Sequence, residues 1–262
     1  MSVVKYLRVP LTIGVAIASA VAAAQQVGSK SSLVVIASNH DLATGQPLEA
    51  EFFQGADLTP KPVSTFSANL VGNTGAAEGM AFASAGILKA SGKGTSIFQD
   101  VIDGPPGLDS DIYGGGNVRA EIEFTDKITI LNTGVFFFQW AVTGYALSQA
   151  GTGDDMFPTF ATAEGNFSVM DSATHQPVGS RIEFTSTGTN GHPQFANGVR
   201  SFNASLNAGD ELFLFGTMKL DSECHGGGWM DIDYGHSAYT VIQRGLNGVG
   251  GPGGFTSESG YA

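Results

Sequence analysis

The chain has 262 residues, and its 24 Asp and Glu outnumber its 12 Lys and Arg, which gives a formal net charge of -12 at pH 7. An acidic field of this kind repels phosphate backbones, which argues against nucleic acid as a partner and suits divalent cations instead. Glycine contributes 37 residues and charged side chains only 14%, a composition typical of short strands joined by tight turns.

The first 24 residues have the layout of a secretory signal peptide. Lys5 and Arg8 precede an apolar run over residues 9–21, and three alanines at 22–24 then offer a small-residue cleavage site. The apolar run is shorter than the ~20 residues that a membrane-spanning helix needs. We therefore expect residues 1–24 to be removed and the mature protein to be secreted or extracellular, with a periplasmic or envelope-associated placement as the alternative.

After the leader, apolar and polar side chains alternate with period two, which predicts β-strands because successive strand side chains point to opposite faces. Clusters of Gly, Asn, Asp and Pro separate these segments, as turns require. The expected strands are 33–37, 80–90, 95–102, 118–130, 135–145, 166–170, 181–186, 200–206, 211–220 and 229–242. Neither an amphipathic helix nor another apolar stretch of membrane-spanning length follows the leader.

Two of these segments carry further information. The alternation over residues 118–130 is interrupted on its apolar face only by Asp126, where we expect a bulge or a turn. The continuous aromatic run within residues 135–145 instead predicts a strand that is buried on both faces.

Many strands at short spacing, without helices between them, predict an all-β fold: an antiparallel β-sandwich, jelly-roll-like, rather than a parallel sheet. A single domain over residues 25–244 is the simplest organisation. The segment 72–94, rich in small residues, fits either flat strands or a flexible loop. Residues 245–262 are glycine-rich, and we expect them to form a mobile C-terminal tail.

Five residues are candidates for ligand contact. Tyr113, Trp229 and Tyr239 are expected surface aromatics, and sugar rings stack on exposed aromatic faces while nearby acids and amides bind the hydroxyls. Asp231 and Asp233 share one face of the last expected strand and are candidate ligands of Ca²⁺. Because Ca²⁺ takes six or more oxygens, two carboxylates are only part of a site, and a solvated polar face is the alternative.

The cysteine and the histidines do not predict a specific metal or catalytic site. Cys224 is the only cysteine, so a disulfide within the chain is excluded, and we expect it to be buried or half-buried, with an intermolecular disulfide or a reactive thiol as the alternative. Cys224, His225 and His236 are candidate soft-metal ligands, although zinc needs three or four. For His236 we favour a hydrogen-bonded core histidine over a metal ligand or proton shuttle.

No serine-hydrolase or zinc-hydrolase motif occurs in the chain. Glu121 and Glu123 share a polar strand face, and we expect them to form ion pairs with Arg119 and Lys127 rather than to serve as catalytic acids. The sequence therefore predicts a protein that is not an enzyme.

Four segments are similar to segments of one group of exported bacterial proteins. They are AFASAGILKA at 81–90, AEIEFTDKITI at 120–130, DYGHSAY at 233–239 and GFTSESG at 254–260. The group that they resemble is the PEP-CTERM type, the substrates of exosortase. Because its Val-Pro-Glu-Pro-like motif, membrane helix and basic end are not found here, we expect an anchorless relative. The resemblance implies a β-rich extracellular protein linked to exopolysaccharide, without catalytic residues.

These observations predict a secreted, non-catalytic structural or binding protein of the extracellular matrix or cell envelope, which contacts exopolysaccharide or self-associates through sheet edges. One alternative is a calcium-stabilised carbohydrate-binding module, which a coplanar row of exposed aromatics would favour. The other is a secreted glycan-active enzyme, which two convergent carboxylates in a deep cleft would favour.

Overall fold

A computed structural model describes residues 26–41, 47–72, 74–99, 112–151, 159–189, 191–246, 249–251 and 254–260. These residues form two antiparallel β-sheets, so the predicted all-β sandwich is confirmed. The expected leader, residues 1–24, lies outside the described residues. Within the described ranges, no helix is long and apolar enough to cross a membrane.

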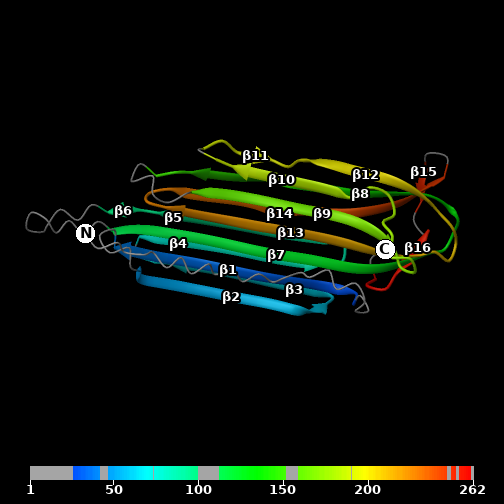
Figure 1. Ribbon diagram of the computed structural model, residues 1–262, viewed down its shortest axis with the longest axis horizontal. Helices are drawn as coiled ribbons and strands as arrows, with labels where there is room; N and C mark the ends of the chain where they lie inside the picture. Colours follow the sequence, from blue (N-terminus) through cyan, green and yellow to red (C-terminus); the bar gives the residue numbers. More distant parts are fainter. Residues whose placement is uncertain are drawn as a thin grey trace, which may run out of the picture.

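The strands of the first sheet, sheet A, follow the long axis of the molecule and stack from β2 at the bottom to β10 at the top in Figure 1. Their spatial order is β10 (Ile182–Gly188), β9 (Phe160–Asp171), β13 (Glu211–His225), β7 (Ile112–Ile130), β1 (Gly28–Asp41) and β2 (Pro47–Lys61). Two short strands, β6 (Phe98–Gln99) and β16 (Phe255–Ser257), also pair with β7.

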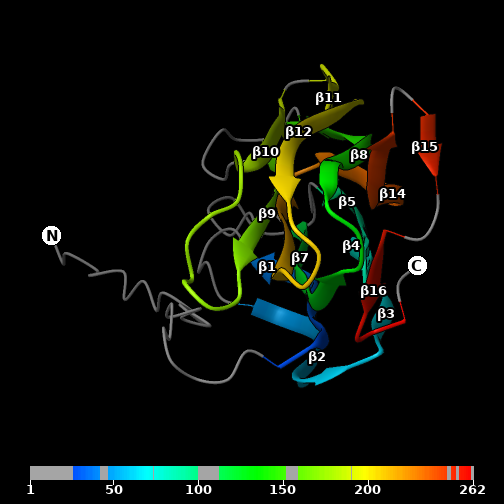
Figure 2. The ribbon, with the colours of Figure 1, turned by 90° about the vertical axis from the view of Figure 1, so that its right-hand side faces the viewer.

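The second sheet, sheet B, packs against sheet A, and Figure 2 shows the two layers nearly end-on. Its order is β11 (Gln194–Phe195), β8 (Gly134–Gln149), β14 (Trp229–Leu246), β5 (Ile87–Ser96), β4 (Gly75–Ser84) and β3 (Val63–Val71). In addition, β12 (Gly198–Leu206) pairs with β8, and β15 (Val249–Gly251) pairs with β14.

The core lies between the sheets and consists of alternate side chains from both. Its largest fully buried members include Trp140, Tyr234, Phe124, Phe136, Phe138 and Phe167. The ring of Phe184 lies 5.5 Å from that of Trp140 and 5.2 Å from that of Tyr234, centroid to centroid. Burying one large apolar side chain contributes roughly 1.5–3 kcal/mol, so this aromatic cluster is a main source of stability.

Strand β8 is not buried on both faces, contrary to what its aromatic run predicts. Phe136 and Phe138 are fully buried, whereas Phe137 between them is 36% exposed. The reason is that one face of sheet B meets the core and the other points to solvent, so the alternation of strand side chains also holds within the run.

The expected single strand 80–90 is a hairpin. Strand β4 ends at Ser84 and β5 begins at Ile87, and Gly86 between them has a φ of 71°, in the left-handed region that suits a tight turn. Most of the small-residue segment 72–94 is therefore strand rather than flexible loop.

Asp126 interrupts the apolar face of β7 without the expected bulge or turn, so that prediction is wrong. The pairing of β7 with β13 continues through Asp126 without a register shift, and the side chain is fully buried. One carboxylate oxygen accepts a hydrogen bond from the Ser257 hydroxyl (2.6 Å). The other accepts from the N–H groups of Ser259 (3.1 Å) and Lys127 (2.8 Å). The buried carboxylate thus holds a C-terminal segment against the sandwich.

The described part of the glycine-rich segment 245–262, for which composition predicts a mobile tail, contains strands. Strand β14 continues to Leu246, β15 pairs with β14, and β16 pairs with β7 in the other sheet. The N–H of Glu258 donates to the carbonyl of Lys127. Because these partners satisfy its backbone groups, the described part of the segment belongs to the sandwich.

Cys224 is fully buried on the core face of β13, as expected. Burial raises the pKa of its thiol from 9.0 to about 12. The thiolate, not the thiol, is the reactive form. We therefore expect modification of Cys224 by a thiol reagent at pH 8 to be at least about a hundredfold slower in the folded protein than in urea.

The raised pKa of Cys224 also predicts a pH dependence of stability. As pH rises above 9, the thiol ionises in the unfolded chain before it does in the folded protein, so the contribution of Cys224 to stability decreases from about pH 9 towards 12. Replacing Cys224 by Ser should abolish this decrease in the free energy of unfolding. The measurement is urea denaturation of both proteins at pH values from 9 to 12. Rapid modification of Cys224 by a thiol reagent in the native protein at pH 8 would contradict the burial of its side chain.

Candidate functional site

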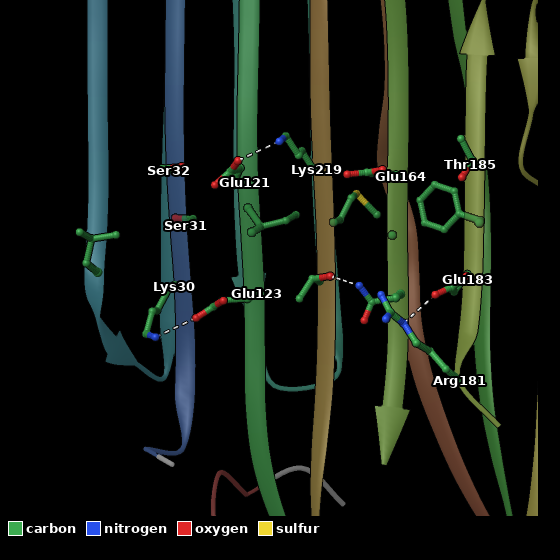
Figure 3. A pocket seen from close by; sticks show the side chains of 17 residues that line it. Lys30, Ser31, Ser32, Glu121, Glu123, Glu164, Arg181, Glu183, Thr185 and Lys219 are labelled. Atoms are coloured by element: carbon green, nitrogen blue, oxygen red, sulfur yellow. Dashed lines mark hydrogen bonds and ion pairs between the residues drawn. The ribbon is translucent and has the colours of Figure 1, made fainter. Parts of the chain in front are cut away.

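An open groove of about 680 Å³ lies on the outer face of sheet A, the face that points away from the core. It crosses strands β1, β7, β13, β9 and β10, which lie side by side in Figure 3. Its polar side chains occupy the alternate positions of strands whose other positions fill the core. On β7, for example, Glu121 and Glu123 line the groove while Ala120 and Phe124 are buried.

Antiparallel register arranges the lining side chains in two rows that cross the strands. The first row contains Ser32, Glu121, Lys219, Glu164 and Thr185, each opposite the next on a neighbouring strand. The second row contains Lys30, Glu123, Thr217, Asn166 and Glu183. Neighbouring strands lie about 4.8 Å apart, so each row spans roughly 20 Å from β1 to β10.

Ion pairs neutralise three of the four carboxylates in the described lining of the groove (Figure 3). The pairs are Lys30–Glu123 at 2.8 Å, Lys219–Glu121 at 3.3 Å and Arg181–Glu183 at 2.7 Å. Exposed pairs of this kind contribute little to stability, so their main effect is to fix the positions of the charged groups.

The partners expected for Glu121 and Glu123 were wrong. Arg119 instead pairs with Asp221 at 3.0 Å, and Lys127 pairs with Glu211 at 2.9 Å. The physical reason is that the nearest charged groups on a sheet surface lie across to the next strand rather than farther along the same strand.

Two polar residues of β9 complete the centre of the groove. The Asn166 amide Nδ2 donates to the Thr217 hydroxyl at 2.5 Å. Glu164 is exposed, and among the described residues its carboxylate has neither an ion-pair partner nor a hydrogen-bond donor. The described lining therefore offers hydroxyls, an amide and charges of both signs, which suits a ligand with many hydroxyl groups.

The site residues expected from the sequence lie mostly on the opposite sheet. Trp229, Asp231, Asp233 and Tyr239 share the outer face of β14, and Trp229 and Tyr239 are 37% and 43% exposed. Ten residues of strand separate the two rings, which is roughly 25–30 Å, so they do not form one platform. Tyr113 is on β7 of sheet A, and its side chain lies outside the described residues.

The carboxylates proposed as calcium ligands already have partners. The Tyr145 hydroxyl donates to Asp231 Oδ2 at 2.9 Å, and the N–H of Gly235 donates to Asp233 Oδ1 at 2.8 Å. Burial, followed by the hydrogen bond to Asp231, raises the pKa of Tyr145 to about 12. No group of three or more His, Cys, Asp or Glu that could hold a metal occurs within the described ranges. The calcium site at Asp231 and Asp233 stays a prediction.

The candidate soft-metal ligands Cys224 and His225 lie in different environments. Cys224 faces the core, whereas the Nε2 of half-buried His225 lies 2.7 Å from Glu223 Oε1. The side chain of His236 lies outside the described residues.

Comparisons with known proteins add little to this geometry. No protein-family model matches the chain, and no curated protein sequence matches it. Among solved structures, the chain is similar to that of TmCBM61 in complex with beta-1,4-galactotriose, at 9% identity over 70% of this chain and 89% of that one. The TM-score is 0.20, a likeness too distant to carry an argument.

Proposed function

We propose that the protein is a secreted, non-catalytic protein that binds a polysaccharide of the extracellular matrix or cell envelope along the groove of sheet A. The observation that carries this proposal is the pair of polar rows that cross five strands within an open groove of about 680 Å³. A groove of this kind offers many hydrogen-bonding groups along one direction, which matches a chain of repeating hydroxylated units better than a compact ligand.

The charge of the groove limits the class of polysaccharide. The described lining holds four carboxylates and three cations, and the whole chain carries a net charge of -12. The carboxylates are those of Glu121, Glu123, Glu164 and Glu183. A polymer of uronates or sulfated sugars would be repelled by this field. We therefore expect neutral or amino-sugar polymers to bind and alginate not to bind.

The open shape of the groove also supports a binding role rather than hydrolysis. Glycoside hydrolysis needs two carboxyl groups that flank one bond, with one of them free to donate a proton. Here Glu121 and Glu123 are each held by a lysine, and Glu164 stands without a partner among the described residues. The groove thus supplies contacts without an evident acid and base pair.

Substitution of Lys219 by Ala should weaken binding about tenfold, because it removes a donor from the centre of the first row and disturbs Glu121. The measurement is affinity electrophoresis of the mature protein in gels that contain soluble β-glucan, β-galactan, chitosan or alginate. Arg119 is the matched control, because its pair with Asp221 bridges the same two strands outside the groove lining.

We expect Arg119→Ala to change the affinity less than twofold. Equal losses for Lys219→Ala and Arg119→Ala would place binding outside the groove. Unretarded migration of the wild-type protein in every gel would overturn the proposed function.

A further inference from the structure

The outer face of sheet B carries a second group of residues suited to a ligand. We call it the aromatic face and define it by Tyr145, Phe195 and Trp229 together with Asp231 and Lys93. Antiparallel pairing places Phe195 opposite Tyr145, and places Asp231 opposite Lys93. The rings of Tyr145 and Phe195 lie 6.1 Å apart at an angle of 60°. Trp229 precedes Asp231 by two residues and therefore points to the same side.

Exposure and polarity on this face fit a sugar rather than an apolar partner. Phe195 is 62% exposed and Trp229 is 37% exposed, so both present ring surface to solvent. Polar groups lie beside the rings: Asp231 is on β14 with Trp229 and accepts the Tyr145 hydroxyl, and Lys93 lies opposite Asp231 on β5. A sugar ring has C–H faces that stack on aromatic rings and hydroxyls that need polar partners. It therefore matches this combination of exposed rings and neighbouring polar groups.

Asp231 gives a second, independent indication of a polar ligand. Its Oδ2 accepts the Tyr145 hydroxyl at 2.9 Å, which fixes the carboxylate. Its Oδ1 is buried and has no hydrogen-bond donor among the described residues. Buried polar atoms in folded proteins normally have a partner, and a ligand hydroxyl would supply one here.

We propose that the aromatic face is a second polysaccharide-binding site, so that one molecule links two polysaccharide chains. This inference rests on the proposed function of the groove. The two sheets form the two layers in Figure 2, so their outer sides point in opposite directions. The groove lies on the outer side of sheet A, and the aromatic face lies on the outer side of sheet B. Packed sheets lie about 10 Å apart, so a single stiff chain on one face does not reach the other. Two sites with this placement make the protein a cross-linker.

Trp229 provides a direct test of the second site. The chain has two Trp residues, and Trp140 is fully buried whereas Trp229 is 37% exposed. Adding soluble β-glucan, β-galactan or chitosan should therefore shift the emission of Trp229, in the wild type and equally in the groove variant Lys219→Ala. An unchanged spectrum with a polymer that retards the wild-type protein in gels would overturn the second site and leave the groove proposal intact.

Cross-linking is tested by light scattering during titration of the same polymers with protein. We expect the scattering to rise to a maximum and then to fall, because excess protein occupies each chain separately. The double variant Trp229→Ala, Phe195→Ala should still bind through the groove but lose the maximum. Phe137→Ala is the matched control, because Phe137 is 36% exposed on the same sheet at a distance from Asp231.

A maximum that persists in the double variant, or that disappears equally in Phe137→Ala, would overturn the cross-linking inference. Sedimentation of the protein without polymer distinguishes linkage through two sites from self-association, and a dimer in that experiment would also overturn it. Absence of binding to every polymer is a different result, since it removes the proposed function itself.

Discussion

Replacing Asp126 by Ala should lower the free energy of unfolding by about 3–5 kcal/mol. The carboxylate is fully buried and accepts hydrogen bonds from the Ser257 hydroxyl and from the N–H groups of Ser259 and Lys127. Each hydrogen bond to a charged group contributes about 1.5–3 kcal/mol, and the variant leaves the donors without their acceptor. Urea denaturation followed by intrinsic fluorescence measures the change.

Two further variants separate the carboxylate from the surface charges beside it. Ser257→Ala removes one donor and should cost less than Asp126→Ala, because the two N–H donors remain. Lys127→Ala removes exposed pairs with Glu211 and Glu258 and should leave the denaturation midpoint nearly unchanged. If Asp126→Ala unfolded at the wild-type urea concentration, the hydrogen bonds of the Asp126 carboxylate would contribute nothing to stability.

Asp126 also has a structural role that the sequence alone does not predict. Within residues 118–130 the alternation alone predicts the strand and its buried face, because it depends only on neighbouring residues. Two of the three donors to Asp126, at Ser257 and Ser259, lie 131 and 133 residues later, in a segment whose glycine content predicts a tail. A polar residue on an apolar face therefore predicts an irregularity of the strand, which the structure does not have.

Strands at the edges of the sheets give weaker sequence patterns than central ones. The sequence predicts neither β2 nor β3, which are the last strands of sheet A and sheet B. In β3 only Ser64 is buried, and β2 exposes Phe52 and Leu58. With one paired neighbour and partial burial, such strands do not need the regular alternation that central strands show.

The groove could be predicted only in part for a related reason. The polar face of Glu121 and Glu123 is visible in the sequence, and so is the shared face of Asp231 and Asp233. Each row of the groove, however, takes one side chain from each of five strands, from Lys30 in β1 to Glu183 in β10. Which strands are neighbours, and in which register, depends on packing of the whole sandwich and is not visible in local periodicity.

Substitution of Gly165 by Val should lower the free energy of unfolding by about 3 kcal/mol and weaken polysaccharide binding as well. Gly165 is buried in β9, between Glu164 and Asn166 of the groove. A Cβ at this position would lie 2.4 Å from a ring carbon of Phe184 and 2.9 Å from the backbone oxygen of Thr217. The backbone of β13 cannot yield as a flexible side chain would, so β9 must shift.

A shift of β9 in the core would also change the groove. Moving β9 displaces both of its lining residues, so the affinity measured in polysaccharide gels should fall together with the urea midpoint. Gly235→Ala is the matched control: its Cβ would come no closer than 3.1 Å, to the side chain of Asp233, and should cost little. A Gly165→Val protein with wild-type stability would mean that β9 and β13 adjust freely. Full binding by a destabilised variant would show that the position of β9 does not set the ligand contacts.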